Sequence, residues 1–196
     1  MTAPLILLLA AGASSRMKGR DKLLEHVNGT ALLRLMSERC VKCGETRVVL
    51  GLGQDARRDA IEDLRVDIVE ATETDGMAAS IRVGVDGIKN RPVMIVLADM
   101  PDITASDLHL LSGLYAQNLS PILQAASKDG QPGQPVIFAP KFLKHLAKLQ
   151  GDQGAKSILK TNAKDVALIP LADERALTDL DTPEDWAAWR ARNPST

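Results

Sequence analysis

The chain has 196 residues, enough for one domain that buries about 70% of its unfolded surface and needs no disulfide or metal to fold. Apolar residues make up 45% and aromatic residues 3%, which is typical of a globule with an aliphatic core. The formal net charge of −1 excludes the basic excess typical of nucleic-acid binders. We therefore expect residues 1–196 to form a single domain that binds a small ligand and no nucleic acid.

Residues 5–24 combine a predicted buried strand with a cationic loop. Residues 5–10 are apolar at every position, as in a central parallel strand covered on both faces. Gly12 follows, and then four cations against one acid, Asp21. The cations are Arg16, Lys18, Arg20 and Lys22. Exposed N–H groups and fixed cations after a strand bind phosphate, so we predict a polyphosphate loop, with a solvated charged loop as the alternative.

The next part of the chain alternates helices and strands. Thr30 is placed to cap a helix that runs to about residue 42. Strands are expected at residues 46–50 and 66–69, on either side of a helix at residues 55–64. Gly76 opens a further helical pattern.

The second half continues this alternation. Residues 93–98 read as a buried strand, and Thr104 with Asp107 predicts a capping box for the next helix. A hairpin-like pair of strands is expected at residues 121–126 and 136–139, with a tight turn at Pro132-Gly133 in the loop over residues 127–135. Helices from about residues 141 and 153, a strand at 166–169 and a last helix capped by Thr182 complete the pattern.

This order of elements predicts an α/β fold, a Rossmann-like three-layer sandwich with a mostly parallel central sheet. Ligands of such sheets bind at the carboxyl ends of the strands. The cationic loop, Asp99 and Asp181 all follow predicted strands or precede the last helix, so we expect them to converge. Cations for phosphate and carboxylates for Mg²⁺ indicate a nucleotide-handling enzyme. A turn residue at Asp99 and a helix cap at Asp181 are the alternatives.

Two further motifs have structural or redox interpretations. Gly51-Leu52-Gly53 follows a predicted strand and precedes Glu70 by about 20 residues, the spacing of a dinucleotide fingerprint. An NAD-binding oxidoreductase is therefore an alternative, although a plain turn explains the segment as well. Cys40 and Cys43 form a C-x-x-C within a helical pattern, which favours two reduced thiols over a redox or zinc pair.

The N-terminus lacks the cationic segment of a signal peptide. The apolar run at residues 4–11 is too short to span a bilayer. We therefore expect a cytoplasmic protein without membrane contact.

The N-terminal segment resembles the signature of MobA-like nucleotidyltransferases, and within them the molybdenum cofactor cytidylyltransferases. The match runs over LAAGASSRM at residues 9–17 and continues at Gly19, Asp21 and the KLL triplet at residues 22–24. Five further segments match in order: GMAASIRVG at 76–84, ADMP at 98–101, PGQPV at 132–136, GDQGA at 151–155 and DLDTPED at 179–185.

The resemblance implies the fold of nucleotide-diphospho-sugar transferases and a transfer of CMP from CTP to molybdopterin cofactor, with release of pyrophosphate. It implies catalytic roles for Arg16, Lys22 and Asp99, Mg²⁺ binding by Asp99 and Asp181, nucleotide binding by Leu9, Ala10, Ala11, Gly12, Arg16, Lys22, Gly76, Met77 and Ser80, and acceptor binding by Gly133, Gln134 and Pro135. A molybdenum enzyme or its chaperone is a further implied partner. The family tends to carry Ala-Ala-Gly in cytidylyl enzymes and Ala-Gly-Gly in guanylyl enzymes, so Ala11 favours CTP.

Three positions depart from the family pattern: Gln134 replaces a frequent His, Lys156 a common Arg, and Ala78-Ala79 the usual serines. Because Lys lacks the planar fork of Arg, the change at Lys156 concerns recognition of the pterin acceptor. Three alternatives remain beside NAD binding: a guanylyltransferase that uses GTP, nucleotidyl transfer to another phosphorylated acceptor, and a nucleotide-binding module without turnover.

Overall fold

The computed structural model describes residues 2–72, 76–151 and 154–194. Within these residues the main sheet has seven strands in the order β5-β4-β1-β6-β8-β7-β9. They are β1 Leu5–Leu9, β4 Thr46–Gly51, β5 Asp67–Ala71, β6 Val93–Leu97, β7 Ile122–Ala126, β8 Pro132–Phe138 and β9 Val166–Pro170. Only β8 runs antiparallel to its neighbours in this sheet, so the predicted mostly parallel sheet is confirmed.

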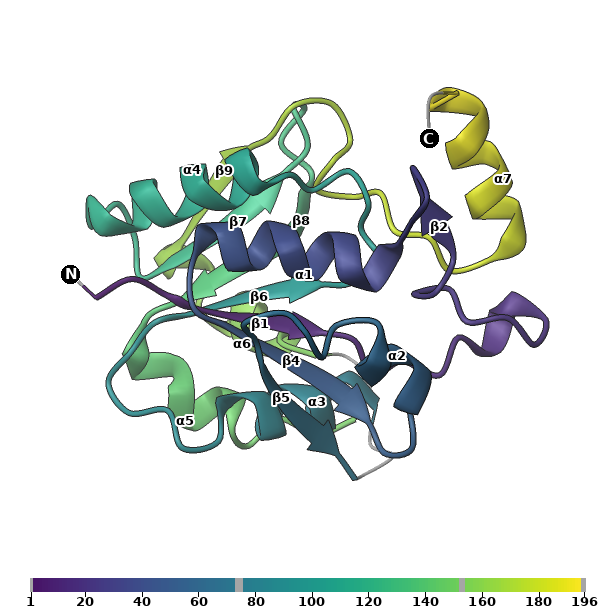
Figure 1. Ribbon diagram of the computed structural model, residues 1–196. Helices are drawn as coiled ribbons and strands as arrows, with labels where there is room; N and C mark the ends of the chain where they lie inside the picture. Colours follow the sequence, from purple (N-terminus) through teal and green to yellow (C-terminus); the bar gives the residue numbers. More distant parts are fainter. Residues whose placement is uncertain (1, 73–75, 152–153, 195–196) are drawn as a thin grey trace.

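Helices cover both faces of the sheet, which gives the expected three layers (Figure 1). On one face lie α1 Leu32–Cys43 and α4 Ala105–Ala116, and on the other lie α3 Gly76–Val85, α5 Leu143–Leu146 and α6 Lys156–Thr161. The short α2 Asp55–Asp59 and the C-terminal α7 Pro183–Arg192 stand near the carboxyl ends of the parallel strands. The 3-10 turns are η1 Ser15–Met17, η2 Pro140–Phe142 and η3 Ala163–Asp165.

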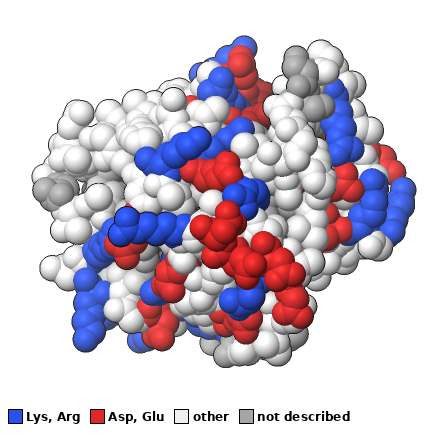
Figure 2. Space-filling model, in the orientation of Figure 1, with Lys and Arg blue, Asp and Glu red and all other residues white. Residues whose placement is uncertain are grey.

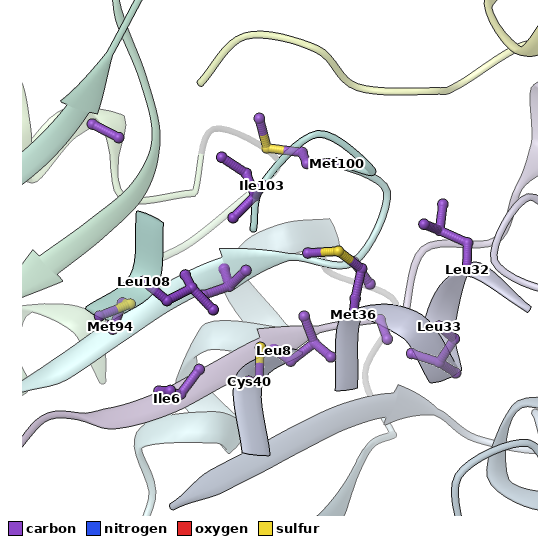
Figure 3. Close-up of a cluster of buried hydrophobic side chains, with 14 of the residues drawn as sticks. Ile6, Leu8, Leu32, Leu33, Met36, Cys40, Met94, Met100, Ile103 and Leu108 are labelled. Carbon is purple, nitrogen blue, oxygen red and sulfur yellow. The ribbon is translucent and has the colours of Figure 1, made fainter. Parts of the chain in front are cut away.

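Strand β1 divides the core into two clusters, because successive side chains of a strand point to opposite faces. Ile6 and Leu8 pack in one cluster with Met36 of α1, whereas Leu7 packs in the other with Ile81 of α3. Figure 3 shows the first cluster, in which side chains of α1, β1 and the segment after β6 meet. The uniformly apolar run of β1 thus marks the centre of the sheet.

The predicted cap at Thr30 is wrong. Thr30 lies in β3 Thr30–Ala31, which pairs antiparallel with β2 His26–Val27, and α1 begins without a side-chain cap. The turn between them is Asn28-Gly29, with φ of 51° and 77°. Asn-Gly favours this hairpin turn. Thr30, which could have capped the helix, therefore pairs with Val27 in the hairpin.

The turn predicted at Pro132-Gly133 is also misplaced, although the β7–β8 hairpin itself is confirmed. Strand β8 begins at Pro132, and the chain reverses earlier, where the Ser127 N–H donates to the Gln131 carbonyl at 2.9 Å. Gly130 supplies the positive φ of 85° that this turn needs. The PGQP segment is therefore part of the sheet.

The remaining boundaries follow the predictions except at two helices. Helix α2 has five residues, whereas the predicted helix extended to residue 64. Residue 153, the predicted start of a later helix, lies outside the described residues, and α6 begins at Lys156. The capping boxes of Thr104 with Asp107 and of Thr182 with Asp185 are present. Among the described residues, no helix has the length and apolar character needed to cross a bilayer.

Replacement of two helical glycines by alanine should change the stability in opposite directions, because one glycine is packed against β1 and the other is exposed. Gly84 of α3 is buried, and a Cβ there would lie 2.4 Å from Cδ1 of the fully buried Leu7. We expect Gly84→Ala to lower the free energy of unfolding by about 1–3 kcal/mol through overpacking. Gly113 of α4 is exposed, and a Cβ there would meet nothing within 4 Å, so Gly113→Ala should raise it by about 0.5–1 kcal/mol.

Urea unfolding of both variants measures these changes. An unchanged midpoint for Gly84→Ala would show that α3 does not pack on β1 as closely as described.

Candidate active site

A lysine ammonium lies between two aspartates at the carboxyl end of the parallel strands. Nζ of Lys22 donates to Oδ2 of Asp99 at 2.5 Å and to Oδ1 of Asp181 at 2.5 Å. Arg16 donates from Nη1 to the other oxygen of Asp181 at 2.7 Å. Lys22 comes from the loop after β1, Asp99 follows β6, and Asp181 precedes α7. The fold thus brings together the residues that the sequence predicted to be catalytic and metal-binding.

The carboxylates keep Lys22 charged. Burial pushes the pKa of Lys22 down, but the negative charges of Asp99 and Asp181 and their hydrogen bonds outweigh it and raise the pKa overall. Burial, followed by the charges of Asp99 and Asp181, also raises the pKa of the nearby Asp179 carboxyl. The site is therefore one in which negative charge has accumulated and is balanced by cations from the N-terminal loop.

Asp99 and Asp181 have the carboxylate chemistry that suits a divalent metal ion. Oδ1 of Asp99 is buried and has no hydrogen-bond partner within the described part of the chain. Carboxylate oxygens are ligands of Mg²⁺, which commonly takes one or two of them and completes its shell with water and phosphate oxygens. In residues 2–72, 76–151 and 154–194, no group of three or more His, Cys, Asp or Glu side chains could hold a metal. Asp99 and Asp181 would therefore supply only some of the ligands that a metal ion needs.

Some backbone groups at the end of β1 and in the loop after it are hydrogen-bonded within the protein, and others are open to a ligand. The Leu9 carbonyl accepts from the Ala98 N–H at 3.1 Å, and the Ala10 N–H donates to the Val49 carbonyl at 2.9 Å. These groups complete the sheet and leave Leu9 and Ala10 little to offer a ligand. The first open donors are the N–H groups of Ala11 and Gly12, which have no partner among the described residues.

Arg57 and Asp21 support this loop, a role for Arg57 that was not predicted from the sequence. Arg57 is 2% exposed and holds both oxygens of Asp21, at 2.7 and 2.8 Å. Burial would raise the pKa of Asp21, but hydrogen bonds and charge from Arg57 outweigh it and lower the pKa. A signal was present in the sequence, because Arg57 shares the helical stripe of Ile61, at i and i+4, where an apolar residue would be expected.

Contacts with α7 connect the N-terminal loop to the C-terminal part of the chain. Lys18 pairs with Glu184 at 2.8 Å, and the Leu180 N–H donates to the Asp99 carbonyl at 3.0 Å. In Figure 2 the cations near the right edge, over η1 and α7, alternate with acidic side chains. Exposed pairs of this kind contribute at most about 1 kcal/mol each, so the buried Lys22 contacts dominate the connection.

The predicted nucleoside residues lie on a different element. Gly76, Met77 and Ser80 occupy the first turns of α3; the first two are exposed and Ser80 is buried. Helix α3 lies below the sheet in Figure 1, whereas the ion pairs around Lys22 join it to Asp99 and Asp181.

The predicted acceptor residues begin β8 at the same edge of the sheet as Asp99, since Val136 of β8 pairs with Ile95 of β6. A Cβ on Gly133 would lie 2.0 Å from the Ala176 carbonyl oxygen, so only glycine fits there. Pro135 is buried, which leaves its side chain no surface for an acceptor. Oε1 of Gln134 is buried and has no hydrogen-bond partner within the described residues.

Three curated proteins share parts of this sequence. The purine catabolism protein PucB of Bacillus subtilis is 29% identical over 112 residues, which cover 57% of this chain and 50% of PucB. The nicotine blue oxidoreductase of Paenarthrobacter nicotinovorans is 29% identical over 190 residues, 90% of this chain and 91% of that protein. The molybdenum cofactor guanylyltransferase of Pseudomonas aeruginosa is 27% identical over 185 residues, 91% of this chain and 90% of that protein. The chain therefore spans about half the length of PucB and nearly all of the other two.

Solved structures share the fold over almost the whole chain. Rv0371c from Mycobacterium tuberculosis H37Rv superposes with a TM-score of 0.83 at 23% identity and covers 95% of this chain and 97% of its own. Its complex with manganese gives a TM-score of 0.77 at 22% identity, with the same coverage. The expected fold of nucleotide-diphospho-sugar transferases is confirmed. The family model described as MobA-like NTP transferase domain matches residues 6–166, and the chain belongs to that family.

Proposed function

We propose that this protein transfers a nucleotidyl group from a nucleoside triphosphate to a phosphorylated molybdopterin-type acceptor, with CTP as the donor and pyrophosphate as the second product. The observation that carries this proposal is Lys22 between Asp99 and Asp181. A triphosphate needs cations for its oxygens, and its metal ion needs carboxylates. Both are present within one cluster, beside backbone N–H groups that are open to an anion.

The proposed chemistry requires alignment more than proton transfer. An oxygen of the acceptor phosphate, already anionic at neutral pH, attacks the α-phosphorus, the bond to the β-phosphate breaks, and a phosphoanhydride forms as pyrophosphate leaves. In this scheme Lys22 and Arg16 stabilise the charge that develops on the α-phosphate and on the leaving pyrophosphate. A metal ion held by Asp99 and Asp181 would supply further charge neutralisation when bound. No histidine is needed, and His26, His109 and His145 are all exposed.

The proposed base of the donor nucleotide and the proposed acceptor are supported by separate observations. Ala11, in the Ala-Ala-Gly form of the loop, supports CTP. The relative from P. aeruginosa is named a guanylyltransferase, which makes GTP the second candidate donor. The same name supports a molybdopterin-type acceptor.

The oxidoreductase alternative has one observation in its favour, the name of the relative from P. nicotinovorans. The Gly51–Gly53 turn does not add to it. The helix that follows has five residues, and Glu70, the expected ribose ligand, is paired with Arg58 at 2.5 Å. A dinucleotide fingerprint requires a full helix whose N-terminus faces the pyrophosphate and an acid free to bind ribose.

Pyrophosphate release tests the proposed function directly. With purified molybdenum cofactor and a divalent metal ion, we expect CTP to give stoichiometric pyrophosphate and the other nucleoside triphosphates to give less. A higher rate with GTP would identify a guanylyltransferase. Nucleotide binding without pyrophosphate release, or a rise in melting temperature with NAD alone, would contradict the proposal.

Lys22→Met keeps the apolar stem of the side chain and removes its charge. Because the ammonium is placed to stabilise transition-state charge, we expect kcat/KM for the triphosphate to fall by about 10²- to 10³-fold. Lys18→Met is the matched control, since Lys18 lies in the same loop but pairs with the exposed Glu184. It should retain activity within about twofold, because exposed pairs contribute little. Similar rates for Lys22→Met and the wild type would refute the role of Lys22.

Metal ion and triphosphate are expected to bind together. Lys22 and Arg16 occupy oxygens of Asp99 and Asp181, so Mg²⁺ or Mn²⁺ alone should change the melting temperature little. CTP with the metal, at about 100 times Kd, should add about 2.7 kcal/mol to the free energy of unfolding. Thermal melts with metal, with CTP in a chelator, and with both compare the three states. A full shift with metal alone would show that the lysine does not compete for the carboxylates.

A further inference from the structure

Two side chains from residues 51–57, Gln54 and Arg57, donate hydrogen bonds to backbone carbonyls of the loop after β1. We propose that Gln54 and Arg57 are positioning residues that direct the backbone N–H groups of Ala11 and Gly12 toward the phosphates of the bound triphosphate. This inference rests on the proposed function, because it takes the loop after β1 to be the triphosphate-binding loop.

Arg57 fixes the first of these N–H groups. The Ala10 N–H donates to Val49 of β4, and the Ala10 carbonyl accepts from Nη1 of Arg57 at 2.5 Å, so both groups face the side of β4 and α2. In a planar trans peptide the carbonyl and the following N–H point in opposite directions. The Ala11 N–H is therefore directed away from α2, toward the side of β1 on which β6 and Asp99 lie.

Gln54 fixes the second N–H group in the same way. Its Nε2 donates to the Ala11 carbonyl at 3.1 Å, while its Oε1 accepts from the Gly51 N–H at 2.7 Å. The Ala11 carbonyl thus faces α2, and the Gly12 N–H points away from it. Gln54 acts as a bridge between the turn after β4 and the loop after β1.

Two successive carbonyls held on one side leave two successive N–H groups on the other. Neither the Ala11 nor the Gly12 N–H has a partner among the described residues. Successive N–H groups that point the same way form a concave anion-binding site. The arrangement therefore explains how this loop can bind phosphate although it is not followed by a long helix, since η1 has three residues.

The same side chains also connect to Lys22. Nη2 of Arg57 donates to Oγ of Ser14 at 3.0 Å, and that oxygen accepts from the Lys22 N–H at 3.2 Å. Arg57 thus contacts both ends of the loop, at Ala10 and, through Ser14 and Asp21, next to Lys22.

The two glycines of the turn after β4 now have a structural reason. A Cβ on Gly51 would lie 3.2 Å from the amide of Gln54 and 3.3 Å from the Ala11 carbonyl oxygen, too close for the bridge to form unchanged. Gly53 has a φ of 74°, which favours glycine. The pattern that resembles a dinucleotide fingerprint thus fits the turn that brings Gln54 to the loop.

NMR of the ¹⁵N-labelled protein, titrated with inorganic tripolyphosphate and with CTP, tests the proposal. In the wild type we expect the amide protons of Ala11 and Gly12 to shift downfield, as hydrogen bonds to phosphate require. Gln54→Glu retains an acceptor for the Gly51 N–H but cannot donate to Ala11. It should bind both ligands at least about tenfold more weakly, through the lost hydrogen bond and the added negative charge, and it should lose the downfield shift at Gly12, which reports the lost hydrogen bond alone.

Two further variants complete the comparison. Arg57→Lys replaces the fork by a single ammonium and should also weaken binding by at least about tenfold. Because Arg57 is buried and its replacement can impair folding, Gln54→Glu, on a less buried side chain, is the deciding variant. Arg58→Gln is the matched control, since Arg58 is the next residue of α2 and pairs with Glu70 at the surface; it should bind as the wild type does.

The outcomes separate this inference from the proposed function. Wild-type affinity and an unchanged Gly12 shift in Gln54→Glu would overturn the positioning role and leave the proposed function intact. Binding with the expected shifts, but without pyrophosphate release from any acceptor, would support the positioning role and overturn the proposed function. A wild-type protein that binds neither ligand would overturn both.

Discussion

The site depends on one ammonium group held between two carboxylates from distant parts of the chain. Without the charge of Lys22, Asp99 and Asp181 would repel each other at the end of the sheet, where burial makes that repulsion costly. In the proposed function, the same ammonium contacts the triphosphate. An anionic ligand and a cationic metal ion therefore complement each other here: the phosphates would take over the lysine, and the metal would take over the aspartates. The negative phosphates would balance the charge of Lys22, and the positive metal ion would balance the charges of Asp99 and Asp181.

The sheet makes this interaction possible through the order of its strands. Because β1 lies between β4 and β6, its C-terminal loop is flanked on one side by residues that follow β4 and on the other by Asp99. The β4 side supplies hydrogen bonds through Arg57, and the β6 side supplies negative charge. On the β4 side, the loop is thus held by the buried Arg57, whose charge is balanced by Asp21. On the β6 side, it faces the carboxylates. A rigid backbone on one side and an exchangeable ion pair on the other suit a site that must bind and release a highly charged ligand.

Local signals in the sequence were reliable where no neighbouring signal competed with them. The helix caps at Thr104 and Thr182 join residues three positions apart and were predicted correctly. Thr30 was not, because an adjacent Asn-Gly turn formed a competing hairpin, and Pro132 begins a strand since the neighbouring strand supplies its pairing. The convergence of the charged residues could be inferred from the strand ends. The role of Arg57 could not, because its contacts lie 36 and 47 residues away and depend on the tertiary fold.

The glycines after β4 show why a motif requires its structural context. In a dinucleotide site the two glycines let the backbone approach a pyrophosphate at the start of a long helix. Here Gly51 allows a glutamine side chain and a carbonyl of the same protein to approach, and the helix that follows is about one turn and a half long. Glycine suits both uses because it has no Cβ, so the sequence pattern alone cannot distinguish them. What separates them is the element that follows: a dinucleotide fingerprint opens a full helix, whereas α2 ends after Asp59.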